Sequence, residues 1–267
     1  MFHFLHSCLA EAERAGAWLF VLAVIFVPLE RLFTQTPQPI FRRQLAADLG
    51  YYVVGNLATN ALMAAAAGLL AAAIYGMLPA AIVRFGRDLT LWQRMLATLV
   101  VGEFGFYWGH RWSHEWKWLW RFHIVHHSPE QVDWLTTTRG HPVDVVFTRM
   151  CGFALIYACG LAQVGASARA TPIAIGVITL FWGFFIHANV RWRFGWLEWV
   201  IATPAFHRWH HTNDEHRDMN YASTLPLWDW VFSTMYLPRR GAPPVYGADT
   251  KIPDGLIGQL LTPFKLR

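Results

Sequence analysis

Long apolar runs constrain the fold of this chain more than any other feature of its sequence. A run of about 20 apolar residues is the length of one membrane-crossing helix. Five segments are largely apolar: residues 17–33, 45–78, 91–109, 143–163 and 172–188. Hydrophobic residues make up 55% of the chain and charged residues only 15%, as in membrane proteins. We therefore predict an all-α integral membrane protein with about four to five transmembrane helices.

The remaining segments suit the same fold. Residues 190–267 contain no run long enough to cross a bilayer, and their Trp and Arg content predicts a cap on the membrane surface. The net charge of +5 is spread over loops beside apolar runs, so it does not indicate nucleic-acid binding. Early charges at Glu11, Glu13 and Arg14 lead us to expect no cleaved signal peptide.

The run 45–78 leaves two interpretations open. Its small residues favour one long tilted helix, and a two-helix re-entrant hairpin is the alternative. Asn56 and Asn60 interrupt the run, and we expect them to form hydrogen bonds between helices.

Histidines are clustered in short, helix-spaced motifs. His110 and His114 are four residues apart, and His123, His126 and His127 have i, i+3, i+4 spacing, which repeats at His207, His210 and His211. On a helix this spacing gathers the rings on one side. A lone histidine is more often a packed core residue than a ligand, but repeated motifs of this kind indicate a metal site.

Topology predicts that most histidines lie on one face of the membrane. If successive spans alternate in direction, the ends at residues 110, 141 and 187 fall on the same side as the cap. More Lys and Arg residues accompany that side, which places it in the cytoplasm. The ten histidines concerned, all candidate metal ligands, are His110, His114, His123, His126, His127, His141, His187, His207, His210 and His211.

The number of imidazoles exceeds what one tetrahedral zinc needs and suits two metal ions held close together. Imidazole suits Zn, Cu, Fe and Ni, so ligand type does not choose among them. No Cys lies near the motifs, which argues against a zinc finger or an iron–sulfur cluster. Oxidation of a lipid C–H bond needs a redox metal and O₂, which favours two iron ions, with zinc as the alternative.

These motifs, together with Asn220-Tyr221 and Leu225-Pro226-Leu227-Trp228-Asp229, resemble the fatty acid hydroxylase / sterol desaturase superfamily over roughly residues 95–236. The resemblance implies a membrane-bound, O₂-dependent oxidase with a histidine-rich dimetal centre that hydroxylates or desaturates a fatty acyl chain, sterol, carotenoid or alkylglycerol. A ferredoxin-like or cytochrome b5-like protein would supply electrons. We expect membrane helices in 1–90, the catalytic region in 91–240 and a tail in 241–267.

Some members of this superfamily carry a second histidine four residues after the one that matches His187, where this chain has Arg191. His141 is either the replacement ligand or a helix-start residue beside Pro142. Asp133 and Asp144 are candidate partners of ligating rings. A surface salt bridge is the alternative for both, and the favoured one for Asp133.

Glu103 is a carboxylate well inside the third apolar run and a candidate catalytic residue. On a helix, Glu103, His110 and His114 fall within about 40° of one another, with Glu103 about 10 Å below His110. It would either orient a polar lipid group or relay a proton, or form a structural hydrogen bond to Asn56 or Asn60.

A membrane metal transporter is the rival function, but transport paths carry ionisable groups through the bilayer and these spans hold almost none. We therefore predict a lipid-oxidising enzyme of the bacterial inner membrane, with its active site facing the cytoplasm.

Overall fold

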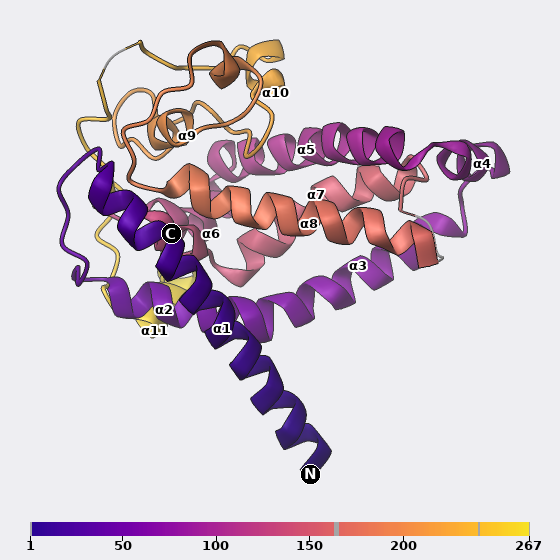
Figure 1. Cartoon of the computed structure of the whole chain (residues 1–267), viewed down its shortest axis with the longest axis horizontal. Helices are drawn as coiled ribbons and strands as arrows, with labels where there is room; N and C mark the ends of the chain where they lie inside the picture. Colours follow the sequence, from indigo (N-terminus) through magenta and orange to yellow (C-terminus); the bar gives the residue numbers. More distant parts are fainter. Residues whose placement is uncertain (1, 163–165, 240, 267) are drawn as a thin grey trace.

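Helices account for the regular structure of the chain (Figure 1). The computed structural model describes the backbone of residues 2–162, 166–239 and 241–266, and the side chains of these except 2–9 and 166–174. Within these residues the only β-type pairings are the isolated bridges Thr34–Val190 and Thr212–Tyr246. The helices of the apolar segments and the connections between them are α1 (Phe2–Leu32), α2 (Leu45–Val54), η1 (Gly55–Thr59), α3 (Asn60–Tyr75), α4 (Ala80–Asp88), α5 (Leu91–Glu115), α7 (Pro142–Ala158) and α8 (Ala166–His187). The remaining helical elements are α6 (Lys117–His127), η2 (Trp134–Thr138), η3 (Gly195–Trp199), α9 (Pro204–His210), α10 (Leu227–Val231) and α11 (Leu256–Lys265).

Among the residues that the structure describes, two helices are long and apolar enough to cross a membrane, Ala10–Leu32 and Leu45–Tyr75. Their apolar side chains are largely exposed, with Phe20 at 71% and Leu69 at 75% of their free surface. Such exposure is costly in water and natural in lipid, so the protein is an all-α chain with membrane character. The number of spans and the cytoplasmic position of the cap stay predictions.

Most of the run 45–78 forms one continuous helix, Leu45–Tyr75, rather than a re-entrant hairpin. α2 passes through a π-helical turn, η1, directly into α3, and the junction residues keep helical backbone angles. Asn56 donates to the Tyr52 carbonyl and Asn60 to the Asn56 carbonyl, four residues back in each case. The prediction that these two amides form hydrogen bonds between helices is therefore wrong, because both donate to carbonyl groups of their own helix.

α5 and α7 pack at very close range, and this contact positions the site. A Cβ added at Gly105 of α5 would lie 2.4 Å from the Cys151 carbonyl oxygen of α7. One added at Gly152 would lie 2.8 Å from the Gly102 carbonyl oxygen. Small residues at a helix crossing let the backbones touch, as in membrane bundles. In Figure 1, α5, α7 and α8 run alongside one another, and α9 lies at one end of them.

Candidate metal centre

Nine histidine rings from four helices and one helix end meet in two groups. The five-histidine group contains His110 and His114 of α5, His123 and His127 of α6, and His210 of α9. The four-histidine group contains His126 of α6, His187 of α8, His207 of α9 and His211 at the end of α9. Within each group, the ligand atoms lie within 4.8 Å of one another, so each could hold a metal ion.

The ring nitrogens within each group are in close contact. In the five-histidine group, Nε2 of His123 lies 3.1 Å from Nε2 of His110 and 3.1 Å from Nε2 of His127. In the four-histidine group, the Nε2 atoms of His187, His207 and His211 are mutually 3.1 to 3.2 Å apart. The groups adjoin each other, since the ring centroids of His127 and His211 are 4.7 Å apart.

The opposite ring nitrogen, Nδ1, of six of these histidines contacts an oxygen that can only accept a hydrogen bond. Carbonyl and carboxylate oxygens have no proton to give, so each Nδ1 must carry the hydrogen and each Nε2 is left with a bare lone pair. The acceptors are the carbonyl oxygens of Tyr221 (to His110), Arg139 (to His126), Gly183 (to His187) and Met219 (to His210), and the carboxylates of Asp218 (to His114) and Asp144 (to His123).

This arrangement of lone pairs fits a bound metal. The Nε2 atoms of His110 and His123 are both bare and lie 3.1 Å apart, so no hydrogen bond joins them in the neutral state. Histidine nitrogens bind zinc at about 2.0–2.1 Å, which places neighbouring ligand atoms about 2.8–3.4 Å apart for ligand–metal–ligand angles of about 90–109°. The observed spacing agrees, and a cation between the rings would turn a repulsive contact into a favourable one.

Burial keeps histidines of both groups neutral, as metal ligation requires. Burial away from water holds the pKa values of His127, His210 and His211 well below 6.5, and repulsion from the neighbouring histidines is the next largest cause. Burial and the nearby His123 lower the pKa of His126 to about 4. Protonation is therefore a poor way to relieve the contacts between these rings.

Asp144 contacts one of the grouped rings, whereas Asp133 has no hydrogen bond to any of them among the described residues. Asp144 accepts the Nδ1–H of His123 at 2.9 Å and the hydroxyl of Ser113 at 3.1 Å. The close α5–α7 packing brings these groups together. Asp133 instead pairs with Arg42 and caps η2, in a partly buried position rather than on the surface.

The buried ion pair between Arg139 and Asp48 fixes the backbone carbonyl that contacts His126. Arg139 is completely buried and donates from Nε to Asp48 of α2 at 2.5 Å. Its carbonyl oxygen is the acceptor that fixes the His126 ring. The same Asp48 pairs with Arg42, so α2 and the preceding segment are joined to the site.

The segment 219–225 supplies two of the carbonyl acceptors and is held rigidly. Asn220 has a φ of 60°, a left-handed conformation that asparagine tolerates, and this lets its two neighbours present their carbonyls to His210 and His110. The Asp229 carboxylate accepts the backbone N–H groups of Tyr221 and Ala222.

Glu103 holds the other end of this segment. It is buried, and its Oε1 accepts the backbone N–H groups of Ser223 and Thr224 at 2.6 Å each, and that of Leu225 at 3.4 Å. The alternative that paired Glu103 with Asn56 or Asn60 is wrong, because backbone N–H groups of the cap satisfy this carboxylate. Among the described residues no hydrogen bond links Glu103 to a histidine, so its participation in catalysis stays a prediction.

His141 lies outside both groups. Its Nδ1 accepts the backbone N–H of Val143 as the N-cap of α7, and its Nε2 faces the Leu260 carbonyl oxygen at 3.3 Å. The ring packs on Phe122, with centroids 5.0 Å apart. Of the two readings open for His141, the structure supports the helix-start residue.

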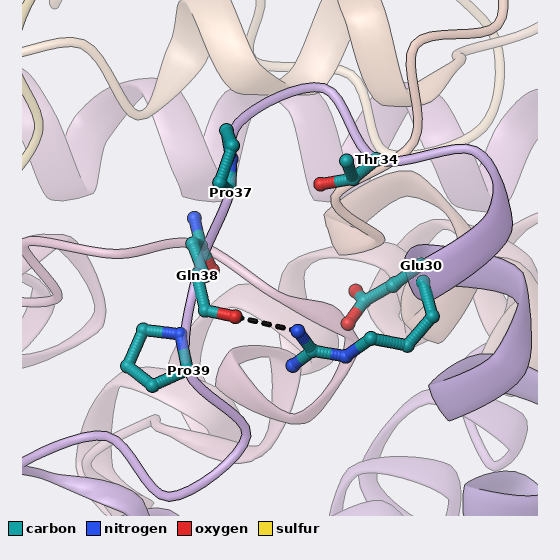
Figure 2. Close-up of a pocket in the computed structure, with 6 residues that line it drawn as sticks. Glu30, Thr34, Pro37, Gln38 and Pro39 are labelled. Atoms are coloured by element: carbon teal, nitrogen blue, oxygen red, sulfur yellow. Dashed lines mark hydrogen bonds between the residues drawn. The ribbon is translucent and has the colours of Figure 1, made fainter.

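A surface pocket of about 340 Å³ lies away from the histidines (Figure 2). Glu30 and Thr34 face Pro37 and Gln38 across it, and no histidine is among its lining residues. The Glu30 carboxylate accepts the backbone N–H groups of Trp134 and Asn189. Glu30 therefore has a structural role in joining three segments.

Sequence reasoning missed Asp218, Met219 and Tyr221 as partners of the rings. Asp218 offered no motif, and a backbone carbonyl leaves no trace in residue type. The only sequence signals near this segment were Asn220-Tyr221 and Asp229, which match the superfamily pattern. That match did not indicate that these residues contact the histidine rings.

A fatty acid hydroxylase family model matches residues 95–234, just over half of the chain and the part that carries all nine grouped histidines. The chain belongs to the fatty acid hydroxylase family. Relatives of this family member include the ornithine lipid hydroxylase OlsE of Rhizobium tropici, 35% identical over 62% of the chain and 49% of the relative. An alkylglycerol monooxygenase of Xenopus tropicalis is 33% identical over 56% of the chain and 31% of the relative.

A very-long-chain aldehyde decarbonylase of Oryza sativa subsp. indica is 28% identical over 56% of the chain and 25% of the relative. The matches thus span at most about half the length of these relatives. No solved structure matches the chain significantly.

Proposed function

We propose that this fatty acid hydroxylase family member is an O₂-dependent membrane oxidoreductase that hydroxylates, or desaturates, a C–H bond of a lipid. The observation that carries the proposal is the pair of adjoining groups of inward-facing Nε2 atoms. The relatives named as a lipid hydroxylase and a monooxygenase support the reaction type. The substrate would be a fatty acyl, sterol, carotenoid or alkylglycerol lipid.

The five-histidine and four-histidine groups would each hold one iron ion, making a di-iron centre. When bound, iron supplies the O₂ activation and redox chemistry that breaking an unactivated C–H bond needs. The histidine set fits this role, since imidazole suits iron and nine rings exceed the four ligands of one tetrahedral zinc. Zinc is the alternative occupant.

The chain's own residues orient the ligands. Asp144, and the carbonyl oxygens of Arg139, Met219 and Tyr221, fix which ring nitrogen carries the proton and which is free to ligate. Burial excludes water and keeps the rings neutral. Glu103 and Asp229 hold the segment 219–225 that carries two of these acceptors, so we assign them a positioning role.

The remaining assignments follow from the proposed reaction. The exposed apolar helices α1 and α2–α3 would place the site beside lipid. Residues 91–240 would form the catalytic region, between membrane helices in 1–90 and a tail in 241–267. A ferredoxin-like or cytochrome b5-like protein would deliver electrons on the basic face, in the cytoplasm beside a bacterial inner membrane.

The test measures metal content and lipid products of the full chain. Membrane lipids from a host with and without the gene are compared, and purified protein is assayed for iron and zinc. We expect about two metal ions per chain in the wild type. His127→Ala and His211→Ala, one in each group, should lower metal content and abolish product.

His216→Ala is the matched control, since His216 lies outside both groups and stacks on Tyr236 with centroids 3.8 Å apart. It should leave metal content and product unchanged. Full metal occupancy in both ligand variants would refute the di-metal assignment. Metal accumulation in vesicles without lipid oxidation would favour a metal transporter.

A further inference from the structure

A hollow of about 200 Å³ in the cap gathers four arginines and no carboxylate. Its lining includes Arg191, Arg193, Arg208 and Arg239 beside Gln35 and Trp209. The volume exceeds the roughly 30 Å³ that one water takes in the liquid. A concentration of like charge in one hollow is costly unless an anion fills it.

Arg208 is the buried base of this hollow. Only 4% of its surface is exposed, and one terminal nitrogen donates to the Val190 carbonyl at 2.7 Å. Its Nε is buried without any partner. A buried guanidinium N–H that donates to nothing loses its hydration without replacement, so an acceptor from a ligand would satisfy it.

The other three arginines leave a net positive charge. Glu198 pairs with Arg193 at 2.9 Å and neutralises it. The guanidinium groups of Arg191 and Arg239, both exposed, have no partner among the residues that the structure describes. Three guanidinium groups therefore remain available to one anion, and the fork of N–H donors on arginine matches phosphate oxygens.

The hollow lies where two apolar helices end. The Arg191 backbone N–H donates to the Phe33 carbonyl, just past the end of α1, and that of Gln35 donates to the Asn189 carbonyl, just past α8. Trp196 and Trp199 follow on the surface, 73% and 58% exposed. Exposed Trp beside the ends of apolar helices is typical of the headgroup level of a bilayer, where lipid phosphates lie.

We propose that this arginine hollow binds the phosphate group of an anionic membrane lipid, with Arg208 at its base and Arg191 and Arg239 at its rim. The site is separate from the histidine groups, and the proposal does not depend on the oxidation chemistry. Binding there would fix the height of the cap over the bilayer.

The experiment compares lipids that share acyl chains. Purified, delipidated full chain is titrated with phosphatidylglycerol or with diacylglycerol of the same chains, and bound lipid is counted by native mass spectrometry. Arg191→Gln with Arg239→Gln should weaken phosphatidylglycerol binding at least fivefold. The double variant Arg84→Gln with Arg87→Gln is the control, because it removes the same charge from α4, at the far end of the helices from α9 (Figure 1).

The control should bind phosphatidylglycerol within twofold of the wild type. Arg208→Met should abolish binding, and the rim variant keeps the test valid if Arg208→Met does not fold. Equal binding by the rim variant and the α4 variant, or equal binding of diacylglycerol, overturns the proposal. Thermal stabilisation by inorganic phosphate without selective lipid binding overturns the lipid assignment in favour of a soluble oxyanion. The lipid assignment is also overturned if the rim variant keeps phosphatidylglycerol binding and loses only the binding of an acidic protein.

Discussion

Replacing Asp144 by Asn tests whether a carboxylate sets the protonation of a metal-ligating ring. The carboxylate accepts the Nδ1–H of His123 at 2.9 Å, which leaves the lone pair of Nε2 facing His110 and His127 at 3.1 Å. An Asn side chain has nearly the same shape, but its amide can donate to Nδ1. The His123 ring can then carry its proton on Nε2, where it blocks ligation.

The expected effect is confined to the five-histidine group. Loss of a partner that orients a metal-bound histidine typically lowers metal affinity by about 10–100-fold, or about 1.4–2.7 kcal/mol. Asp144 has no hydrogen bond to any ring of the four-histidine group among the described residues. Under mild chelation, metal content should therefore fall from about two ions per chain toward one.

The assay is a chelator titration of the full chain in detergent, with metal counted by elemental analysis and folding followed by Trp fluorescence. Ser113→Ala is the matched control, because it removes the second hydrogen bond to Asp144, 3.1 Å long, and leaves the carboxylate on His123. It should keep both ions. Wild-type affinity for both ions in a folded Asp144→Asn protein would refute the reasoning.

Three further predictions concern Glu103, pH and topology. Glu103→Gln exchanges a charged acceptor of the Ser223 and Thr224 N–H groups for a neutral one, so stability should fall by about 1–2 kcal/mol in thermal melts, with metal retained; an at least tenfold loss of lipid oxidation would mark a role in catalysis, and wild-type turnover a structural one. In chelator-treated protein, the pKa of His126 is about 4 when folded and about 6.5 when unfolded, so the unfolded state binds more protons between these values and melting temperature should fall as pH drops from about 6.5 toward 4; a flat profile would contradict burial of neutral rings. A reporter fused after Arg267 should be cytoplasmic and one near Arg87 external, and an external C-terminal reporter would reverse the topology.

Residue spacing predicted the histidine centre well because ligation needs a particular side chain at a helical period. Nine of the ten histidines named as candidate ligands lie in the two groups, including all eight in the motifs. His141 was included because it starts a helix on the expected face, yet its ring caps α7 and packs on Phe122. The membrane face of a residue gives its side of the bilayer but neither its lateral position nor the direction of its ring, so it cannot identify a ligand.

Partners made by backbone atoms could not be predicted. The carbonyl oxygens of Tyr221, Met219 and Arg139 carry no signature in residue type. Glu103 was recognised as a buried carboxylate from the sequence, but its partners come from residues 223–225, over a hundred positions away. Only the packing of the cap on α5 determines that contact.

The sequence by itself determined the helical, apolar character of the chain and the histidine spacing. Only the tertiary structure decided how the rings are shared. The spacing at 123, 126 and 127 predicted three rings on one side, but His123 and His127 enter one group and His126 the other. His207 and His211 likewise separate from His210. Residues i and i+4 lie about 40° apart around a helix, whereas i+3 and i+4 lie about 100° apart, so each short helix lies between the two groups and contributes to both.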